Sequence, residues 1–264
     1  MKKVSIIMAI YNCENTLDDA IKSIENQTYK NWELILCDDG SKDNTYKLAI
    51  EYAKKNPNIK VYQNEQNMGL NFSLNKCLQY TNGEYIARMD GDDISLPDRI
   101  EKEVEFLETH TEYAIVSTPM KYFDDEGIFK VGKGKGEPQI TKFAKGTPFC
   151  HAPCMVKKEA YTAVKGYTES PKRLRVEDWD LWIKMYKEGY KGFVMEEPLY
   201  MMRDDRSAYS RRKFKYRVNE ARVSCMAVRE LGLPKQYFIW SIRPFIAGLA
   251  PKFIYNYIHR RNFK

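Results

Sequence analysis

A run of acidic residues, Asp90-Gly91-Asp92-Asp93, could hold a divalent cation. Magnesium and manganese prefer carboxylate oxygens and keep several water or phosphate ligands, so two aspartates at this spacing can supply part of a site. We expect Asp92 to bind the metal directly, and Asp90 to bind it through water or to bind a ribose. The glycine between them lets the backbone approach closely. A cation held there would stabilise the charge that grows on a diphosphate leaving group.

The same residues have an ordinary structural alternative. Loops are rich in aspartate, and an Asp-x-Asp pattern alone more often forms an Asx-turn or a helix cap. Asp93, which precedes Ile94-Ser95-Leu96-Pro97, fits such a cap. Whether this motif forms a metal site therefore depends on the strands and loops that position it.

Five short apolar runs in the first 120 residues are typical of β-strands, because they are β-branched or aromatic and are bounded by turn residues. They are Val4–Ile10, Glu33–Cys37, Ile59–Gln63, Tyr85–Met89 and Ala114–Thr118. Helical patterns lie between them. This alternation predicts a mainly parallel sheet with helices on both faces.

Three intervening helices show apolar stripes at helical spacing. The stripes are Leu17, Ile21 and Ile24; Leu70, Leu74, Cys77 and Leu78; and Ile100, Val104 and Leu107. We expect Asn15 or Thr16 to cap the first helix, and Pro97 to lie just inside the start of the third. A fourth helix, with apolar residues between 181 and 186, is headed by Glu177-Asp178-Trp179-Asp180, whose acidic groups suit its positive end.

Sheets of this kind bind ligands at the carboxyl ends of their strands. The loops at that edge follow residues 10, 37 and 89. All three are polar and turn-forming: Tyr11-Asn12, Asp38-Asp39-Gly40-Ser41 and Asp90-Gly91-Asp92-Asp93. Because they come from separate strands and should share one edge, they favour a ligand site over three unrelated turns.

Two other motifs resemble known kinds of binding site, but each lacks a feature that such a site requires. Cys150-His151-Ala152-Pro153-Cys154 lacks the second ligand pair of a structural zinc site. The segment Val131–Gly136 is basic and glycine-rich, but it lacks the Gly-Lys-Ser/Thr ending of a phosphate loop. We expect it to form either a mobile flap over a substrate or a solvated linker.

The charge of the chain changes after residue 202. Residues 203–264 contain 15 Lys and Arg against 4 Asp and Glu, whereas residues 1–202 contain 28 against 32. This split argues against a general nucleic-acid binder and favours a tail that meets an anionic surface. The aromatic and apolar residues of the tail fit a membrane interface, and no uncharged run is long enough to predict a span. The alternative is a helical tail packed on the body or on a second subunit.

The start of the chain and its cysteines point to the cytosol. The apolar run after Met1-Lys2-Lys3 is too short for a signal peptide. The six cysteines are scattered without a disulfide framework.

Four segments resemble family 2 glycosyltransferases of the GT-A fold, in order and spacing. They are residues 4–12, 38–45, 67–69 and 83–93, within a match over roughly residues 3–202. The resemblance implies a Rossmann-like catalytic domain at 1–202, with a nucleotide-sugar half at 1–120 and an acceptor half at 121–202. Residues 203–264 would then form a basic, helical, membrane-facing extension. Many bacterial enzymes of this kind build O-antigens, capsules and related surface glycans.

The resemblance also implies how the donor is bound. Ala9 and Tyr11 would cradle a uracil, with the Tyr11 ring packed on the base. Asp39 would accept a hydrogen bond from the uracil N3–H, which cytosine lacks, and Asp38 would support the same loop. Arg88 would pair with nearby carboxylates or with the donor.

A catalytic base is implied at Glu177-Asp178, and we expect it to be Asp178. It would take a proton from the acceptor hydroxyl as that oxygen attacks the anomeric carbon, and one displacement inverts the configuration. The helix end would keep Asp178 ionised at some cost in basicity. Asp178 could instead be a cap, which would leave Glu177 as base or orienting residue. Trp179 would either form an apolar platform for a sugar or pack in the core. His151 would either contact the donor or acceptor or have a structural role.

Family members often carry a later histidine as an extra ligand of the metal or the diphosphate. The corresponding segment here, residues 200–210, has none. Arg203 or Arg206 could contact the diphosphate instead, or Asp205 could complete the metal site.

Together these features predict an inverting, UDP-sugar-dependent hexosyltransferase that uses Mn²⁺ or Mg²⁺. Its expected partners are a glycan acceptor on a polyprenyl diphosphate and, through residues 211–264, the inner face of the cell membrane, with a homo-oligomer as a further candidate. A nucleotidyltransferase would carry a glycine-rich triphosphate loop near the first strand, unlike Ala9-Ile10-Tyr11-Asn12. An inactive binding module would not need Asp92 and Asp178.

Overall fold

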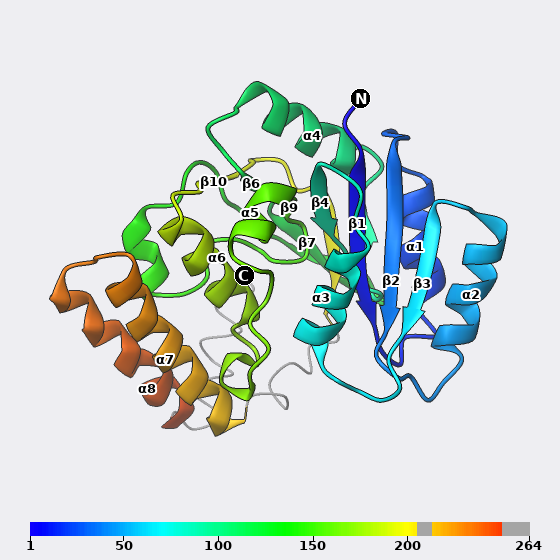
Figure 1. Cartoon of the computed structure of the whole chain (residues 1–264). Coiled ribbons are helices and arrows are strands. Elements are labelled where there is room, and N and C mark those ends of the chain that lie inside the picture. Colours follow the sequence, from blue (N-terminus) through cyan, green and yellow to red (C-terminus); the bar gives the residue numbers. More distant parts are fainter. Residues whose placement is uncertain (205–212, 250–264) are drawn as a thin grey trace.

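A seven-stranded sheet forms the centre of the computed structural model, which describes residues 1–204 and 213–249 (Figure 1). The strands lie in the order β10 (Gly192–Val194), β6 (Ile115–Ser117), β9 (Met155–Lys157), β4 (Tyr85–Arg88), β1 (Val4–Ile10), β2 (Trp32–Asp38) and β3 (Ile59–Gln63). Neighbours are parallel, except that β9 runs antiparallel to β4 and β6. The five predicted strands and the mainly parallel sheet are confirmed.

Side chains of β1 alternate between two cores. Ile6 and Met8 belong to one core, and Ile7 belongs to the other. The first core includes residues of α1 (Leu17–Glu25), α2 (Thr45–Lys55) and α4 (Arg99–Thr109); the second includes residues of α3 (Leu70–Gln79), α5 (Lys158–Ala163) and α6 (Glu177–Lys187). Because successive side chains of a strand point to opposite faces, the continuous apolar run of β1 requires helices on both sides.

Two helix starts differ from the prediction. Thr16 occupies the N-cap position of α1, but its hydroxyl donates to the carbonyl oxygens of Cys13 at 3.3 Å and Gly91 at 2.9 Å. Pro97 lies outside α4, whose N-cap residue is Asp98. The Thr16 bond links α1 to the loop after β4, so this residue connects two loops instead of capping a helix.

The sequence did not predict a second sheet. Its strands lie in the order β5 (Ile94–Ser95), β11 (Tyr200–Arg203), β7 (Met120–Asp124) and β8 (Gly127–Val131). These strands are two to five residues long and come from distant parts of the chain, so alternation along the sequence gives little signal. The sheet places β11 beside β5, directly after the acidic run.

The segment Val131–Gly136, which was expected to form a flap or a solvated linker, is attached to the body at two of its glycines. The N–H of Gly132 donates to the carbonyl of Met120 at 2.8 Å. Gly136 forms an antiparallel bridge with Val194, with N–O distances of 2.8 and 3.1 Å. Backbone hydrogen bonds thus attach the segment to β7 and β10.

The start of the basic tail packs on the body. In α7 (Phe214–Glu230), Val223 and Ala227 are buried in the second core, and the Asn219 amide donates to two carbonyls near α6 at 3.0 and 3.1 Å. A 3₁₀ segment, η4 (Lys235–Ile242), and α8 (Arg243–Leu249) follow. For α7, the structure therefore agrees with the alternative of a helical tail that packs on the body. Residues 211–212 and 250–264 of the predicted membrane-facing segment lie outside the described residues.

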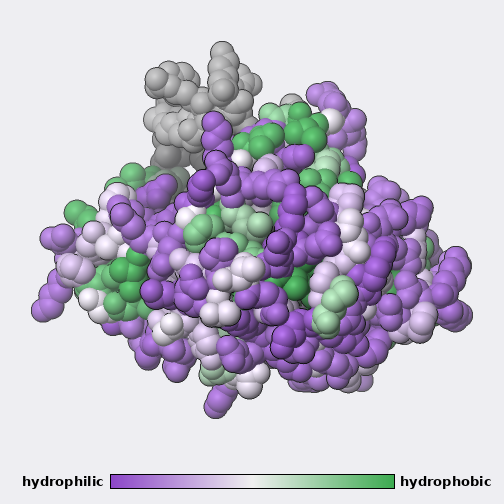
Figure 2. Space-filling view, turned by 90° about the horizontal axis from the view of Figure 1, so that it is seen from above, coloured by the Kyte–Doolittle hydropathy of each residue, from purple (hydrophilic) through white to green (hydrophobic). Residues whose placement is uncertain are grey.

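The surface carries scattered apolar side chains. Figure 2 shows a face that is mostly hydrophilic and broken by separate hydrophobic patches. In η4 and α8, Ile239, Ile242 and Ile246 are 66%, 51% and 66% exposed. Within residues 1–204 and 213–249, no helix has the length and apolar character that crossing a bilayer requires.

Candidate active site

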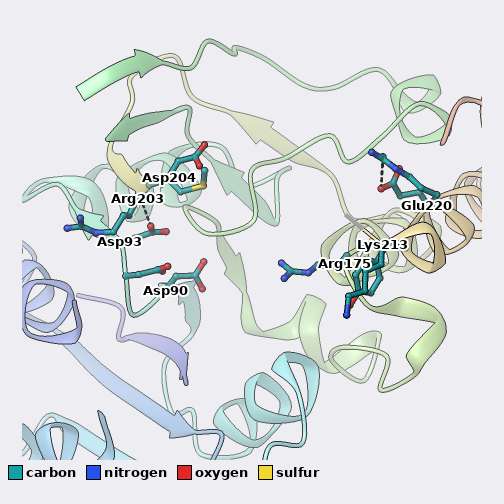
Figure 3. Close-up of a pocket in the computed structure, with 11 residues that line it drawn as sticks. Asp90, Asp93, Arg175, Arg203, Asp204, Lys213 and Glu220 are labelled. Atoms are coloured by element: carbon teal, nitrogen blue, oxygen red, sulfur yellow. Dashed lines mark hydrogen bonds and ion pairs between the residues drawn. The ribbon is translucent and has the colours of Figure 1, made fainter. Parts of the chain in front are cut away.

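Three carboxylates lie together after β4. One oxygen each of Asp90, Asp92 and Asp93 lies within 4.8 Å of the others, and all three residues line a cavity of about 630 Å³ (Figure 3). Carboxylate oxygens are the preferred ligands of hard divalent cations, and the cavity leaves room for water or phosphate. The two predicted ligands, Asp92 and Asp90, are therefore placed together, with Asp93 beside them.

Asp93 is not a helix cap, contrary to the prediction. It is 2% exposed, and its Oδ1 accepts the N–H of Arg203 at 2.8 Å. The hydroxyl of Tyr200 also bonds the Asp93 carboxyl and accepts the N–H of Asp90 at 3.1 Å. Strand β11 thus holds two members of the cluster, because antiparallel pairing with β5 brings it to them.

Tyr200 is a site residue that sequence reasoning missed. It is fully buried, and the guanidinium carbon of Arg99 lies 5.0 Å from the centroid of its ring. Its hydroxyl position depends on the pairing of β11 with β5, which no local pattern reveals. The only signal was its place at the head of the segment that lacks the family histidine.

Gly91 permits a close contact, but the contact is with protein. A Cβ atom there would lie 3.0 Å from Sγ of Cys13 and 3.0 Å from Cγ2 of Ile10. The carbonyl oxygen of Gly91 accepts the Thr16 hydroxyl. The glycine therefore lets the acidic loop pack against the end of β1.

Negative charge is concentrated in the cluster. Burial is the main reason that the pKa of Asp92 is raised above its usual range, and the charge of Asp90 raises it further. The same two causes, with Asp92 added, raise the pKa of Asp93. Arg88 is buried and pairs with Asp90 at 2.5 Å, which is one of its two predicted roles. One arginine offsets part of the charge, and the remainder favours a bound cation.

The predicted nucleotide loops meet at one edge. The Asn12 N–H donates to the Ser41 hydroxyl at 3.0 Å, and the Lys42 N–H donates to the Asn12 side chain at 2.8 Å. With the Thr16–Gly91 bond, these contacts join the loops after β1, β2 and β4. The predicted convergence of the three loops is confirmed.

Asp39 is fixed by three donors. Its Oδ1 accepts from the Asn64 amide at 2.9 Å and the Met68 N–H at 2.8 Å, and its Oδ2 accepts from the Gly69 N–H at 2.8 Å. Oδ2 thus retains acceptor capacity. The uracil hydrogen bond of Asp39 stays a prediction.

Asp38 supports the loop, as expected. Its Oδ2 accepts from the Ser41 N–H at 3.1 Å and from the Gln63 amide at 3.0 Å. Its buried Oδ1 has no hydrogen-bond partner within the described ranges. Tyr11 is 45% exposed, which leaves its ring free to cover a base, and Ala9 lies one residue before the end of β1.

Glu177 and Asp178 form the first turn of α6, and Val176 is the N-cap residue. Thr147 and the Trp179 N–H favour the ionised form of Asp178, yet burial is the larger effect and raises the pKa of Asp178. The helix end lowers the pKa of Asp178 through the Trp179 N–H, as predicted, but burial has the larger effect, so the predicted net cost in basicity is not found. Burial, followed by the charge of Asp178, raises the pKa of Glu177 as well.

His151 and Asp178 line a second cavity of about 410 Å³. A ring nitrogen of His151 lies 2.9 Å from the Tyr167 hydroxyl, and burial lowers the pKa of His151 well below its usual value, so its ring is neutral at pH 7. Trp179 is 7% exposed, and its Nε1 donates to the carbonyl of Phe143 at 2.8 Å. Trp179 thus takes the core-packing position of its two alternatives.

Arg203 lines the first cavity but is partly engaged elsewhere. Its guanidinium bonds Asp125 at 3.0 Å and lies 4.6 Å from the ring centroid of Phe123. The other candidates of this segment, Arg206 and Asp205, lie outside the described residues.

Similar proteins were found by sequence. The model described as Glycosyl transferase family 2 matches residues 5–164. EpsE of Bacillus subtilis (strain 168), named as a glycosyltransferase, is 45% identical over 260 residues, covering 98% of this chain and 94% of EpsE. A UDP-Gal:alpha-D-GlcNAc-diphosphoundecaprenol beta-1,3-galactosyltransferase of Escherichia coli is 30% identical over 273 residues, covering 98% of this chain and 96% of that protein.

Structure comparison agrees on the fold. TarS 1-349 of S. aureus, solved in complex with UDP-GlcNAc, matches with a TM-score of 0.72 at 19% identity, over 92% of this chain and 70% of TarS. The expected GT-A fold is therefore confirmed. Because the family model spans more than half of the chain and EpsE aligns over nearly all of it, this chain belongs to glycosyl transferase family 2 and is a glycosyltransferase.

Proposed function

We propose that the chain transfers a hexose or an N-acetylhexosamine from a UDP-sugar to a hydroxyl of a glycan acceptor, with inversion. The carrying observation is that the charge of one buried arginine, Arg88, acts on both acidic groups. It pairs with Asp90, and its charge also lowers the pKa of Glu177 and of Asp178. The candidate metal site and the candidate base are thus both influenced by one buried guanidinium.

UDP is the donor nucleotide that fits the loops after β1 and β2. The free acceptor capacity of Asp39 suits the N3–H of uracil, which cytosine does not offer. The exposed ring of Tyr11 suits the face of the base, beside Ala9. The UDP-GlcNAc bound by TarS, which shares the fold, is consistent with this choice.

Mn²⁺ or Mg²⁺ would be held by Asp92 and Asp90. Such a cation would neutralise charge on the departing diphosphate. Asp93 and Tyr200 would position the two ligands through the bonds that tie this loop to β11. Arg203 and Arg206 remain candidates for further diphosphate contacts.

Asp178 would act as the general base. The acceptor oxygen forms a bond to the anomeric carbon while the bond from that carbon to the diphosphate oxygen breaks. The hydroxyl proton passes to Asp178, and the bonding electron pair leaves with UDP. Attack on the face opposite the leaving group inverts the configuration. A pKa raised by burial increases the basicity of Asp178.

The acceptor would be a glycan on a lipid diphosphate, in bacterial polysaccharide synthesis. The named acceptor of the Escherichia coli relative, which aligns over 98% of this chain, is a sugar on diphosphoundecaprenol. Such an acceptor would bring the enzyme to the cytoplasmic face of the membrane. His151 and Asp178 would then line the acceptor side, where their cavity lies.

A donor screen tests the proposal. UDP release would be measured with Mn²⁺ for UDP-Glc, UDP-Gal, UDP-GlcNAc and UDP-GalNAc, using GlcNAc on undecyl diphosphate as acceptor. We expect one donor to be preferred and EDTA to abolish release. Asp92→Ala should lower the rate roughly 1,000-fold, since a metal supplies several kcal/mol of charge stabilisation.

Asp19→Ala is the matched control, because Asp19 is an exposed aspartate in the first turn of α1. It should keep the rate of the unchanged enzyme. Full activity of Asp92→Ala or in EDTA would refute the metal assignment, and a product of retained configuration would refute the single displacement.

A further inference from the structure

Two cations whose side chains form no hydrogen bond or ion pair with the described residues face the acidic cluster across the main cavity. Arg175 and Lys213 line the same 630 Å³ cavity as Asp90 and Asp93. Figure 3 shows the two aspartates on one side and the two cations on the other, with the guanidinium of Arg175 directed toward Asp90. Arg175 precedes α6, and Lys213 precedes α7, so two separate elements build this side.

The other cations of the cavity are already paired. Arg217 bonds Glu220 at 2.9 Å, and Arg203 bonds Asp125 at 3.0 Å. Over residues 1–204 and 213–249, neither the Arg175 side chain nor the Lys213 side chain makes a hydrogen bond or ion pair, although the charge of Arg175 acts on Glu177. Arg175 and Lys213 therefore remain free to bind an anion that enters the cavity.

The backbone of Arg175 is in the left-handed region, with φ of 67°. Residues other than glycine, asparagine and aspartate seldom adopt this conformation, because Cβ crowds the following carbonyl. Strained backbone of this kind is often retained where it aims a functional side chain. Here it accompanies a guanidinium that points into the cavity.

We propose that Arg175 and Lys213 bind a phosphate group of the acceptor. A guanidinium binds two phosphate oxygens at once, and an ammonium adds a point charge. The inference rests on the proposed function for the identity of the acceptor. The donor diphosphate belongs with the metal at the cluster, whereas Arg175 lies on the loop that leads into α6, the helix that carries the proposed base Asp178, and its charge acts on Glu177. A phosphate on this side therefore comes from the molecule whose hydroxyl meets Asp178.

The binding test needs neither metal nor turnover. Inorganic pyrophosphate would be titrated calorimetrically into the full-length protein in EDTA, so that the aspartates have no cation to share with it. We expect binding to weaken at least tenfold in Arg175→Asn/Lys213→Gln, because two charge-assisted contacts are lost. No binding by the unchanged protein, or equal binding by the variant, would overturn the proposal.

The control is Lys165→Asn/Lys235→Gln. Lys165 is also an exposed basic residue with a left-handed backbone, at φ of 57°, and Lys235 is exposed at the start of η4. Neither lines the cavity. This variant loses the same charge and should bind pyrophosphate like the unchanged protein. If pyrophosphate binding were weakened equally in the control, the loss would be explained by net charge alone, and the assignment of Arg175 and Lys213 as phosphate ligands would be overturned.

A kinetic arm separates the two sources of phosphate. Acceptor KM would be measured for GlcNAc on undecyl diphosphate and for GlcNAc on undecyl alcohol. We expect Arg175→Asn/Lys213→Gln to raise KM about tenfold for the diphosphate acceptor only, with the affinity for UDP and Mn²⁺ unchanged. A matching loss of UDP affinity would assign the cations to the donor and overturn the acceptor proposal. If the unchanged enzyme used neither acceptor, that result would count against the proposed function. The pyrophosphate titration would still decide whether Arg175 and Lys213 bind phosphate.

Discussion

The residues of the donor side and those of the acceptor side are held in place by different means. On the donor side, Asp39 accepts from three donors, and Asp90 and Asp93 are bonded to β11. On the acceptor side, Asp178 is buried at the start of α6, and Arg175 has a strained backbone and a side chain without a hydrogen bond or ion pair to the described residues. The family model ends at residue 164, before both of these acceptor-side residues.

This difference suggests a division of labour. A nucleotide diphosphate and its metal are constant parts of the reaction, so a networked, preorganised site suits them. An acceptor differs from one enzyme to another, and loops that carry few hydrogen bonds can change without disturbing the fold. We therefore expect changes on the donor side to affect metal or nucleotide binding, and changes on the acceptor side to affect chemistry and acceptor choice.

The largest effect is expected for Asp178→Asn. An amide cannot accept the proton, so kcat should fall by roughly 100- to 10,000-fold, while the KM for the UDP-sugar stays unchanged. Initial rates over a donor series would measure both. A loss of less than about tenfold would assign the base to another group, with Glu177 first to test.

Asp180→Asn is the contrast in the same helix. Asp180 is 2% exposed, accepts from the Thr168 hydroxyl at 2.6 Å and pairs with Arg173. Its replacement should lower the free energy of unfolding by about 1–3 kcal/mol, because buried partners lose an ionised acceptor, with little change in kcat. Thermal denaturation of both variants would separate chemistry from stability.

The next effect is expected on the donor side, for Tyr200→Phe. Removing the hydroxyl frees the Asp90 N–H and one bond to Asp93, so affinity for Mn²⁺ should fall about 10- to 100-fold. Calorimetric titration of the metal would measure this loss, and excess Mn²⁺ should restore activity. Tyr186→Phe is the control, since it removes a hydroxyl that bonds Gly192 away from the cluster. Unchanged metal affinity in Tyr200→Phe would show that β11 does not position the ligands.

A smaller effect is expected in the pH profile. Asp178 must be ionised to accept a proton, so kcat/KM should fall as the pH falls through its pKa. Because burial raises that pKa, the fall should begin at a higher pH than for an ordinary aspartate. Thr147→Val removes a hydroxyl that favours the ionised form of Asp178, so it should move the acid limb upward by about one pH unit or less. A limb that moves downward would mean that another group controls it.

Much of the donor side could be predicted from the sequence because its determinants are local. The strands of the first 120 residues are short apolar runs between helices, and a parallel sheet brings their ends to one edge. The loops holding Tyr11, Asp39 and Asp92 follow directly from that rule. Asp93 was assigned wrongly because its partners, the Arg203 N–H and the Tyr200 hydroxyl, lie more than a hundred residues away.

The acceptor side was harder to predict because its determinants are long-range. The second sheet pairs strands of two to five residues from distant segments, and the fixed position of Val131–Gly136 depends on a bridge to Val194. The basicity of Asp178 depends on burial, whereas the sequence showed only the helix end. Arg175 gave no signal, since its backbone angle follows from the path of the loop before α6.

The smallest effect is expected in the stability of Arg175→Asn. Asparagine tolerates a left-handed backbone better than arginine, so the variant should gain about 1 kcal/mol, or about 2–4 °C in Tm. Lys165→Asn should gain a similar amount, because its backbone has the same strain. The two variants should differ in function: only Arg175→Asn should weaken pyrophosphate binding in EDTA. Thermal denaturation beside that titration would show whether strain and binding are linked at position 175. If Arg175→Asn lowered Tm, then contacts of the guanidinium with the folded protein would outweigh the strain, and the side chain would not be free for a ligand.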